Sequence, residues 1–149
     1  MELADVADDL TEVLLTETQI HDKIAELARR VEQDYAGERP LLVGVLKGAV
    51  MVMADVAREL KMHVDMDFMA VSSYGASTES SGVVRILKDL DADLEGRHVI
   101  IVEDIIDSGL TLAWLRANLE SRGPASLEIL ALLRKPDAAK VDVDVKYFG

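Results

Sequence analysis

One stretch of sequence decides the fold of this chain: Arg97-His98-Val99-Ile100-Ile101-Val102-Glu103-Asp104-Ile105-Ile106-Asp107-Ser108-Gly109-Leu110-Thr111-Leu112. The four β-branched residues 99–102 are typical of a strand that is buried on both faces, as in a parallel sheet. Two adjacent carboxylates, Glu103 and Asp104, then interrupt the apolar run. A third carboxylate, Asp107, opens a turn of small residues, and apolar residues recur at helical spacing after it. The stretch therefore predicts a strand, an acidic strand end, a short turn and a helix.

This order of elements has a chemical meaning. In open parallel sheets, ligands bind beyond the carboxyl ends of the strands, and a turn that enters a helix offers unpaired backbone N–H groups to an anion. Gly109 lets the backbone approach a ligand closely, and Ser108 and Thr111 add hydroxyl donors. Carboxylates repel a phosphate, but they accept hydrogen bonds from sugar hydroxyls or hold Mg²⁺. We therefore expect Glu103 and Asp104 to bind the hydroxyls of a ribose 5-phosphate whose phosphate lies in the turn.

The same spacing also fits an ordinary strand-to-helix connection without a ligand. In that case Asp107 is the N-cap of the helix, and Glu103 and Asp104 lie on a solvated strand end. Two carboxylates directly after four residues of buried type are costly unless a ligand uses them. The binding interpretation is therefore favoured over the purely structural one.

Composition limits the class of protein. A chain of 149 residues, half of them apolar, is long enough for one domain with a substantial core. It has no cysteine, which excludes disulfides, thiolate zinc sites and a cysteine nucleophile. Its apolar runs are too short to cross a membrane, and its acidic N-terminus is unlike a signal peptide. We expect a cytoplasmic protein with no membrane partner.

The net charge of −12 bears on the partners of the protein. Residues 1–40 alone hold 11 acidic and 4 basic residues, and such an acidic surface disfavours binding to nucleic acid. A small phosphate site is still compatible with this charge, because it needs only local N–H groups and one or two cations. We expect a small anionic ligand and no nucleic acid.

Helical and strand patterns alternate along the rest of the chain. A helix is expected to begin after Thr16, with Gln19 completing a capping box, and to end before Gly37; further helices are expected at residues 49–60 and 112–119. Strands are expected at residues 41–46, 64–71, 83–87, 126–133 and 141–148, and a polar loop at residues 72–82. This alternation predicts an α/β fold: one domain over residues 1–149, with a mainly parallel twisted sheet and helices on both faces.

Residues 102–111, Val-Glu-Asp-Ile-Ile-Asp-Ser-Gly-Leu-Thr, resemble the phosphoribosyl pyrophosphate (PRPP) signature of the type I phosphoribosyltransferases. More narrowly, the chain resembles the purine salvage branch, the hypoxanthine(-guanine) phosphoribosyltransferases, from about Leu14 to its last residue. The resemblance implies transfer of a 5-phosphoribosyl group from PRPP to N9 of hypoxanthine or guanine, which gives IMP or GMP and pyrophosphate. It also implies Mg²⁺ as cofactor, a 6-oxopurine base and a purine mononucleotide as ligands, and a homodimer or homotetramer.

The resemblance assigns roles to individual residues. Asp107 would be the catalytic base at the purine ring, and Glu103 and Asp104 would also hold the metal, through ribose or water. The PRPP and nucleotide site would comprise Glu103, Asp104, Asp107, Ser108, Gly109, Leu110 and Thr111.

Three further pieces of a site follow from the same resemblance. Lys47 and Gly48 would bind pyrophosphate, in a loop that often has a non-proline cis peptide bond before the lysine. Ser73 and Tyr74 would belong to a lid, the polar loop at residues 72–82, that closes over the reacting sugar. Lys135 would donate to the exocyclic oxygen of a 6-oxopurine, because an ammonium group has donors and no acceptor.

The family pattern continues beyond Gly149 with a segment that stacks on the purine, so we expect a domain truncated at its C-terminus. Tyr147 and Phe148 are not expected to replace the stacking residue. Three alternatives stay open: a preference for xanthine, a nucleotide-sensing regulator of the same fold that binds RNA, and a phosphosugar-binding protein without chemistry. The acidic composition disfavours the RNA-binding regulator.

Overall fold

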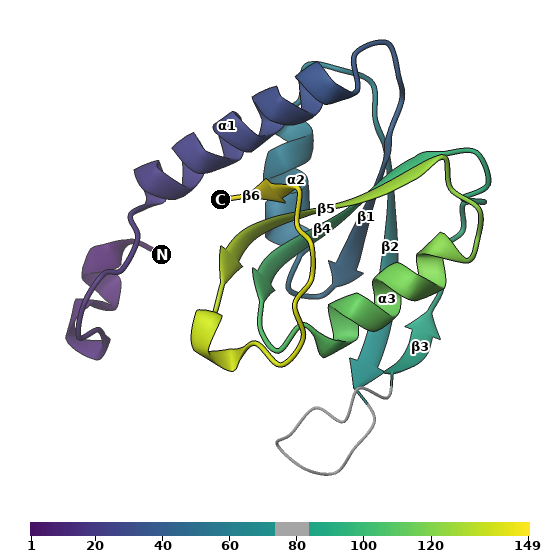
Figure 1. Ribbon diagram of the computed structural model, residues 1–149. Coiled ribbons are helices and arrows are strands. Elements are labelled where there is room, and N and C mark those ends of the chain that lie inside the picture. The colour runs from purple at the N-terminus through teal and green to yellow at the C-terminus, as the bar shows by residue number, and fades with distance from the viewer. Residues whose placement is uncertain (74–83) are drawn as a thin grey trace.

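Six strands form a single sheet in the computed structural model of the chain, which describes residues 1–73 and 84–149 (Figure 1). The strand order is β3-β2-β1-β4-β5-β6. Neighbouring strands are parallel except for β2 and β3, which pair antiparallel. The predicted mainly parallel sheet is confirmed. The strands are β1 Leu41–Leu46, β2 Asp65–Ser73, β3 Val84–Lys88, β4 His98–Ile106, β5 Ser126–Arg134 and β6 Tyr147–Phe148.

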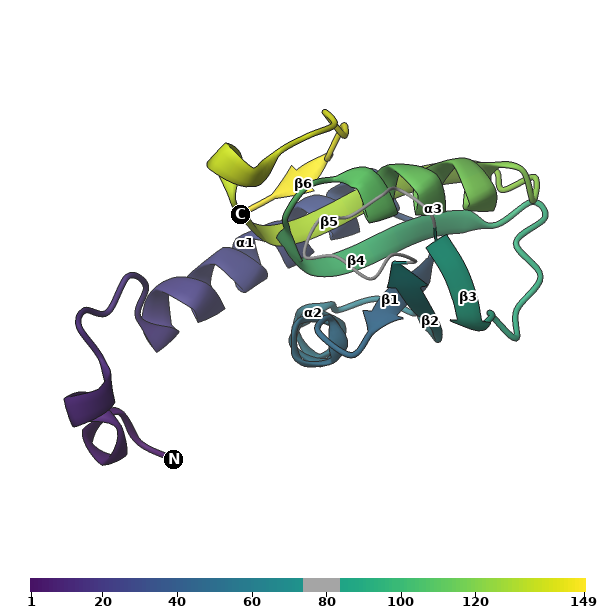
Figure 2. The same cartoon turned by 90° about the horizontal axis from the view of Figure 1, so that it is seen from below.

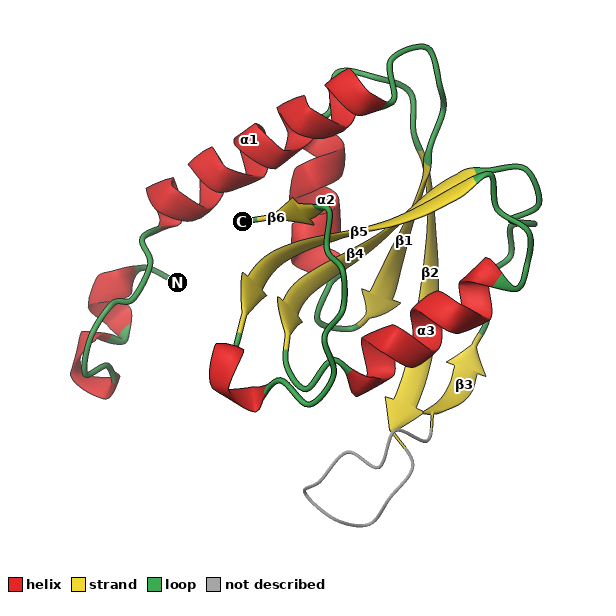
Figure 3. Ribbon diagram, viewed as in Figure 1, coloured by secondary structure: helices red, strands yellow, loops and turns green. Residues whose placement is uncertain are grey.

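Helices cover both faces of this sheet, as the sequence predicts. In Figure 2, α2 and α3 lie on opposite sides of the strands. Figure 3 shows the same alternation of helix and strand by colour, with short helical turns at the N-terminal end and before β6. The helices are α1 Glu17–Asp34, α2 Val50–Glu59 and α3 Leu110–Glu120, and the 3-10 turns are η1 Leu3–Asp5, η2 Ala7–Asp9 and η3 Pro136–Ala138.

The start of α1 is fixed by the predicted capping box. The Thr16 hydroxyl accepts from the backbone N–H of Gln19 at 3.1 Å, and the Gln19 side chain accepts from the backbone N–H of Thr16 at 2.8 Å. The two contacts satisfy helix N–H and flanking N–H groups that otherwise have no partner. Ile24, Leu27 and Val31 then fall on one buried face.

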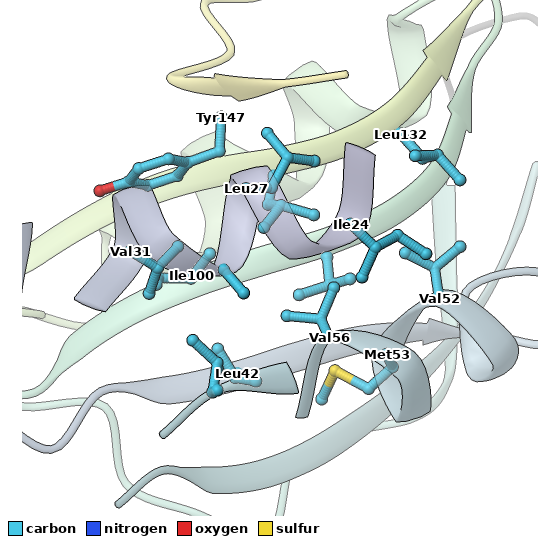
Figure 4. Close-up of a cluster of buried hydrophobic side chains, with 14 of the residues drawn as sticks. Ile24, Leu27, Val31, Leu42, Val52, Met53, Val56, Ile100, Leu132 and Tyr147 are labelled. Atoms are coloured by element: carbon cyan, nitrogen blue, oxygen red, sulfur yellow. The ribbon is translucent and has the colours of Figure 1, made fainter. Parts of the chain in front are cut away.

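The core has two halves, one on each side of the sheet. On one side, α1 and α2 pack against the sheet through Ile24, Leu27, Val31, Val52, Met53 and Val56, which meet Leu42, Ile100, Leu132 and Tyr147 (Figure 4). On the other side, Leu112, Leu115 and Leu119 of α3 pack against β4 and β5, and the partly buried Trp114 joins that half. Because β1 and β4 are covered on both faces, β1 and residues 99–102 of β4 are continuously apolar.

The strand expected at residues 141–148 is wrong for most of its length. Only Tyr147 and Phe148 pair with β5. The backbone N–H groups of Lys140 and Val141 instead donate to the carbonyl of Ser108, at 2.8 and 3.1 Å. The alternation in the sequence therefore reflects valines that face the α3 half of the core from an extended segment, without a strand ladder.

Among the described residues, no helix is long and apolar enough to cross a membrane.

Tyr147 provides a test of how the C-terminal strand is anchored. Its ring is fully buried, and its hydroxyl donates to Asp34 at 2.6 Å; burial raises the pKa of this phenol. We expect Tyr147→Phe to lower the free energy of unfolding by about 1 kcal/mol, since one hydrogen bond is lost. Tyr147→Ala should cost about 3–5 kcal/mol, since it also leaves a cavity. Urea unfolding measures both, and similar costs for the two variants would contradict this account.

Candidate active site

The carboxyl ends of β1, β4 and β5 lie at one edge of the sheet, because these strands are parallel. Ile106, the last residue of β4, is opposite Arg134, the last residue of β5. The backbone N–H of Lys135 donates to the carbonyl of Ile106 at 2.9 Å. The Lys135 ammonium lies 3.8 Å from Oδ2 of Asp107, and both side chains are exposed. The structure thus brings the predicted base-binding lysine and the predicted catalytic acid together.

The loop after β1 lies against the acidic strand end. The Leu46–Lys47 peptide bond is cis, as the resemblance implies. A Cβ atom added to Gly48 would lie 2.9 Å from Oδ2 of Asp104, so the carboxylate packs directly on the glycine backbone. Lys47 is exposed beside this contact. The residues predicted for pyrophosphate and for ribose, far apart in sequence, are therefore neighbours in space.

The turn 107–111 leads into the N-terminus of α3. Gly109 has φ +82° and is the residue before the first turn of α3, so Asp107 is not the N-cap that the structural alternative required. The backbone N–H of Leu110 donates to the Ser108 hydroxyl at 3.3 Å. A cavity of about 120 Å³ is lined by Glu103, Ile105, Ile106, Asp107, Ser108, Gly109, Thr111 and Leu112. One hollow therefore joins an acidic side chain to a helix N-terminus, which suits a sugar phosphate.

A second face of this turn was not predicted from the sequence. Ser108 accepts backbone hydrogen bonds from Lys140 and Val141, and a Cβ atom on Gly109 would lie 2.6 Å from the carbonyl oxygen of Val141. Residues 139–143 therefore stand directly behind the turn. The sequence signal was hidden, because the alternating valines of this segment resemble a strand.

One acid of the neighbouring pair, Glu103, has a strongly raised pKa. Burial, reinforced by the neighbouring charge of Asp104, raises the pKa of the Glu103 carboxyl to about 8. The anionic form of this carboxyl is disfavoured, because burial removes its hydration and the Asp104 charge repels it. Strongly shifted carboxyls of this kind are typical of functional sites.

The remaining predicted residues are only partly placed. Ser73 is the last residue of β2, and Tyr74 lies outside the described residues, so the lid prediction stays a prediction. Within residues 1–73 and 84–149, no three His, Asp or Glu side chains gather as they would around a metal held by protein alone. Tyr147 is part of the core, and Phe148 packs on the Arg134 guanidinium at 4.9 Å.

Comparison with known proteins decides the family. Residues 12–149 match the phosphoribosyl transferase domain. The chain belongs to the phosphoribosyl transferase family. The hypoxanthine-guanine phosphoribosyltransferase of Mycobacterium tuberculosis strain H37Rv is 54% identical over 147 residues, covering 95% of this chain and 73% of that protein. The family and the fold predicted from the sequence are confirmed.

Two solved structures extend this comparison. A hypoxanthine phosphoribosyltransferase from Staphylococcus aureus superposes with a TM-score of 0.93 at 44% identity, covering 97% of this chain and 79% of that one. A hypoxanthine phosphoribosyl transferase from Trypanosoma cruzi, described for the role of its C-terminal region in oligomeric state and activity, has a TM-score of 0.86. Its sequence is 40% identical to this phosphoribosyltransferase chain, and the match covers 93% of this chain and 76% of the Trypanosoma cruzi chain.

Glu103 should make stability depend on pH in the metal-free, ligand-free protein. The folded-state pKa of about 8 lies above the usual value of 4.5, so the folded state binds this proton more tightly than the unfolded state. The free energy of unfolding should therefore fall as pH rises from about 4.5 to 8. Glu103→Gln should flatten this part of the profile, as measured by urea unfolding at several pH values. An unchanged slope in that variant would show that another group is responsible.

Gly109 offers a test of the turn with a matched control. Gly109→Ala places Cβ against the Val141 carbonyl, whereas Gly37, at φ +79°, has nothing within 4 Å of the added atom. Both variants meet the left-handed penalty of about 1 kcal/mol, but only Gly109→Ala should also displace the turn. We expect its affinity for ribose 5-phosphate to fall about tenfold or more, with Gly37→Ala unchanged, by titration calorimetry. Equal binding by both variants would remove the turn from the site.

Proposed function

We propose that this chain transfers the 5-phosphoribosyl group from PRPP to N9 of hypoxanthine or guanine, releasing pyrophosphate and a purine mononucleotide. The packing of Asp104 on Gly48 supports this most directly. It sets the loop proposed for pyrophosphate beside the carboxylates proposed for ribose, and β4 continues from these carboxylates into the turn proposed for the 5-phosphate. The three sites follow the order of the groups in PRPP.

The reacting sugar would be held from both ends. Glu103 and Asp104 accept hydrogen bonds from the ribose hydroxyls. The cationic sugar and Mg²⁺ would lower the raised pKa of Glu103, so that the negative charge of both acids favours the sugar as the bond to pyrophosphate breaks. The backbone N–H groups and hydroxyls of the turn 107–111 hold the 5-phosphate. Lys47 and the backbone at Gly48 stabilise the negative charge of the departing pyrophosphate. Fixing both ends of PRPP supplies much of the acceleration through orientation.

The donor set at this edge suits Mg²⁺. That ion keeps several waters and binds to one or two carboxylates together with substrate phosphates, so a pair of acids is enough and no cage of three protein ligands is needed. Glu103 and Asp104 would hold it, directly or through ribose and water. When bound, it would neutralise charge on pyrophosphate.

The purine would lie over Asp107 and Lys135. The Lys135 ammonium donates to the exocyclic oxygen of a 6-oxopurine, and Asp107, 3.8 Å away, accepts a proton from the ring. Attack by N9 on the anomeric carbon then completes the transfer.

Further parts of the proposal concern partners and surroundings. Ser73 and Tyr74 are proposed to belong to a lid that excludes water from the cationic sugar. Self-association into a dimer or tetramer is proposed because the related Trypanosoma cruzi protein is described for the effect of its C-terminal region on oligomeric state. A cytoplasmic location is proposed from the composition, which lacks cysteine.

The function is tested by incubating the chain with PRPP, Mg²⁺ and radiolabelled hypoxanthine, guanine, xanthine or adenine. The expected products are IMP and GMP with pyrophosphate. Transfer to xanthine alone would mean that xanthine, and not hypoxanthine or guanine, is the base. Binding of a mononucleotide without any transfer would favour a nucleotide-binding protein of the same fold.

The acidic pair should act more on turnover than on binding. Glu103→Gln and Asp104→Asn keep the size of each side chain and remove its charge. If the charges stabilise a cationic sugar, kcat should fall about tenfold or more with a smaller change in KM for PRPP. Glu95→Gln, an exposed acid before the amino end of β4, serves as the control. A rise in KM with unaltered kcat would mean that the pair only positions the ribose.

Lys135 should set the choice between 6-oxo and 6-amino purines. Lys135→Gln keeps a donor and adds an acceptor, so adenine should compete better; a change of about tenfold in the ratio of kcat/KM for hypoxanthine and adenine is expected. Lys61→Gln, beyond the C-terminal end of α2, should leave the ratio unchanged. Undiminished rejection of adenine by Lys135→Gln would assign the preference to other groups.

A further inference from the structure

Residues 139–146 form an extended segment between η3 and β6. Figures 1 and 2 show this yellow part of the chain running past the N-terminal end of α3, on the α3 side of the sheet. It is not a strand, and its only buried side chain is Val143, which is 7% exposed and packs in the α3 half of the core. Val143 and the partly buried Val145 are the side chains of the segment that pack in this half of the core, so the position of the segment depends on specific polar contacts as well.

The segment forms the back of the turn 107–111. The Ser108 carbonyl accepts from the N–H groups of Lys140 and Val141, at 2.8 and 3.1 Å. The Val141 carbonyl oxygen and the Val143 side chain lie 2.6 and 3.3 Å from where a Cβ atom of Gly109 would be. A shift of this segment would therefore turn the Ser108–Gly109 peptide and reorient the N–H groups at the start of α3.

Two arginines donate to backbone carbonyls of the segment: Arg30 to that of Lys146 at 2.8 Å, at the β6 end, and Arg116 to that of Asp144, nearer in sequence to Val141. The Arg116 guanidinium, on α3, donates from Nη1 to the carbonyl of Asp144 at 2.8 Å and from Nη2 to that of Leu127 at 3.5 Å. Its Nε donates to Glu120 at 3.2 Å. The side chain is 24% exposed; its bond to Leu127 is partly buried, and those to Asp144 and Glu120 are exposed. A planar guanidinium can bridge two carbonyls from different elements, which a lysine ammonium does poorly.

We propose that Arg116 is a positioning residue for the 5-phosphate: it fixes residues 139–146 against the turn 107–111 and thereby sets the affinity of the turn, without touching the ligand. This inference rests on the proposed function for the identity of the ligand. It adds a residue on the far side of the turn, on the second helical turn of α3, to the site.

The first experiment needs no activity. Amide hydrogen exchange of the ligand-free chain reports the bonds from Lys140 and Val141 to Ser108. Arg116→Gln should speed exchange at these two amides by about tenfold, since a charge-assisted anchor of the segment is lost. Arg122→Gln is the matched control: Arg122 is similarly buried and binds Asp89 and Asn118, with no bond to the segment. Exchange that is unchanged in Arg116→Gln, or equally faster in both variants, overturns the proposal.

The second experiment measures the consequence for the ligand. Arg116→Gln should weaken binding of ribose 5-phosphate about threefold to tenfold, and raise KM for PRPP by a similar factor, because only part of the lost anchoring energy reaches the turn. KM for hypoxanthine and kcat should change by less than about twofold. Arg116→Lys should lie between Arg116→Gln and the unmodified chain. A purely structural role would lower stability and change the two KM values equally, which overturns the proposal.

Failure of this inference differs from failure of the proposed function. If the unmodified chain transfers phosphoribose but Arg116→Gln binds ribose 5-phosphate unchanged, only the role of Arg116 falls. If the unmodified chain binds ribose 5-phosphate without transferring it, and Arg116→Gln binds it more weakly, the role of Arg116 stands and the proposed reaction falls. If the unmodified chain binds no ribose 5-phosphate, the role of Arg116 in phosphate affinity is overturned as well.

Discussion

The parallel pairing of β1, β4 and β5 is the constraint on which the rest of the structure depends. Parallel ladders need both faces covered, which requires α1 and α2 on one face and α3 on the other. The same pairing brings three strand ends to one edge, so that loops from distant parts of the chain meet there. The site is thus a consequence of how the core is buried, and its residues lie on the rims of rigid strands.

Charge explains how an acidic protein can bind an anion. The net charge of −12 is a property of the whole surface, whereas a phosphate meets only the N–H groups, hydroxyls and cation within a few ångströms. At this edge the acids are segregated: Glu103 and Asp104 are at the strand end, and the turn that follows presents backbone donors. Burial and the Asp104 charge raise the pKa of Glu103, so this acid is costly to ionise while no ligand is bound.

The sequence predicted much of this structure because short-range chemistry is strong here. The four β-branched residues before Glu103 fit a buried strand, the Thr16–Gln19 pair fits a helix start, and Gly109 fits a left-handed turn. Residues 141–148 were misjudged because alternating valines fit either a strand or an extended chain against a core. The choice depended on where the N–H groups of Lys140 and Val141 found acceptors, and the Ser108 carbonyl is 32 and 33 residues away in sequence.

By itself the sequence determined the order of strands and helices along the chain, the acidic strand end, the glycine turn and the family resemblance, because each depends on residues that are neighbours in the sequence. Tertiary structure alone decided that Asp104 packs on Gly48, that Lys135 lies beside Asp107, that residues 139–143 lie behind the turn, and that Arg116 donates to the Asp144 carbonyl. These contacts join residues that are 28 to 56 positions apart. Local propensity cannot specify them, since they exist only once the parallel sheet has brought the strand ends together.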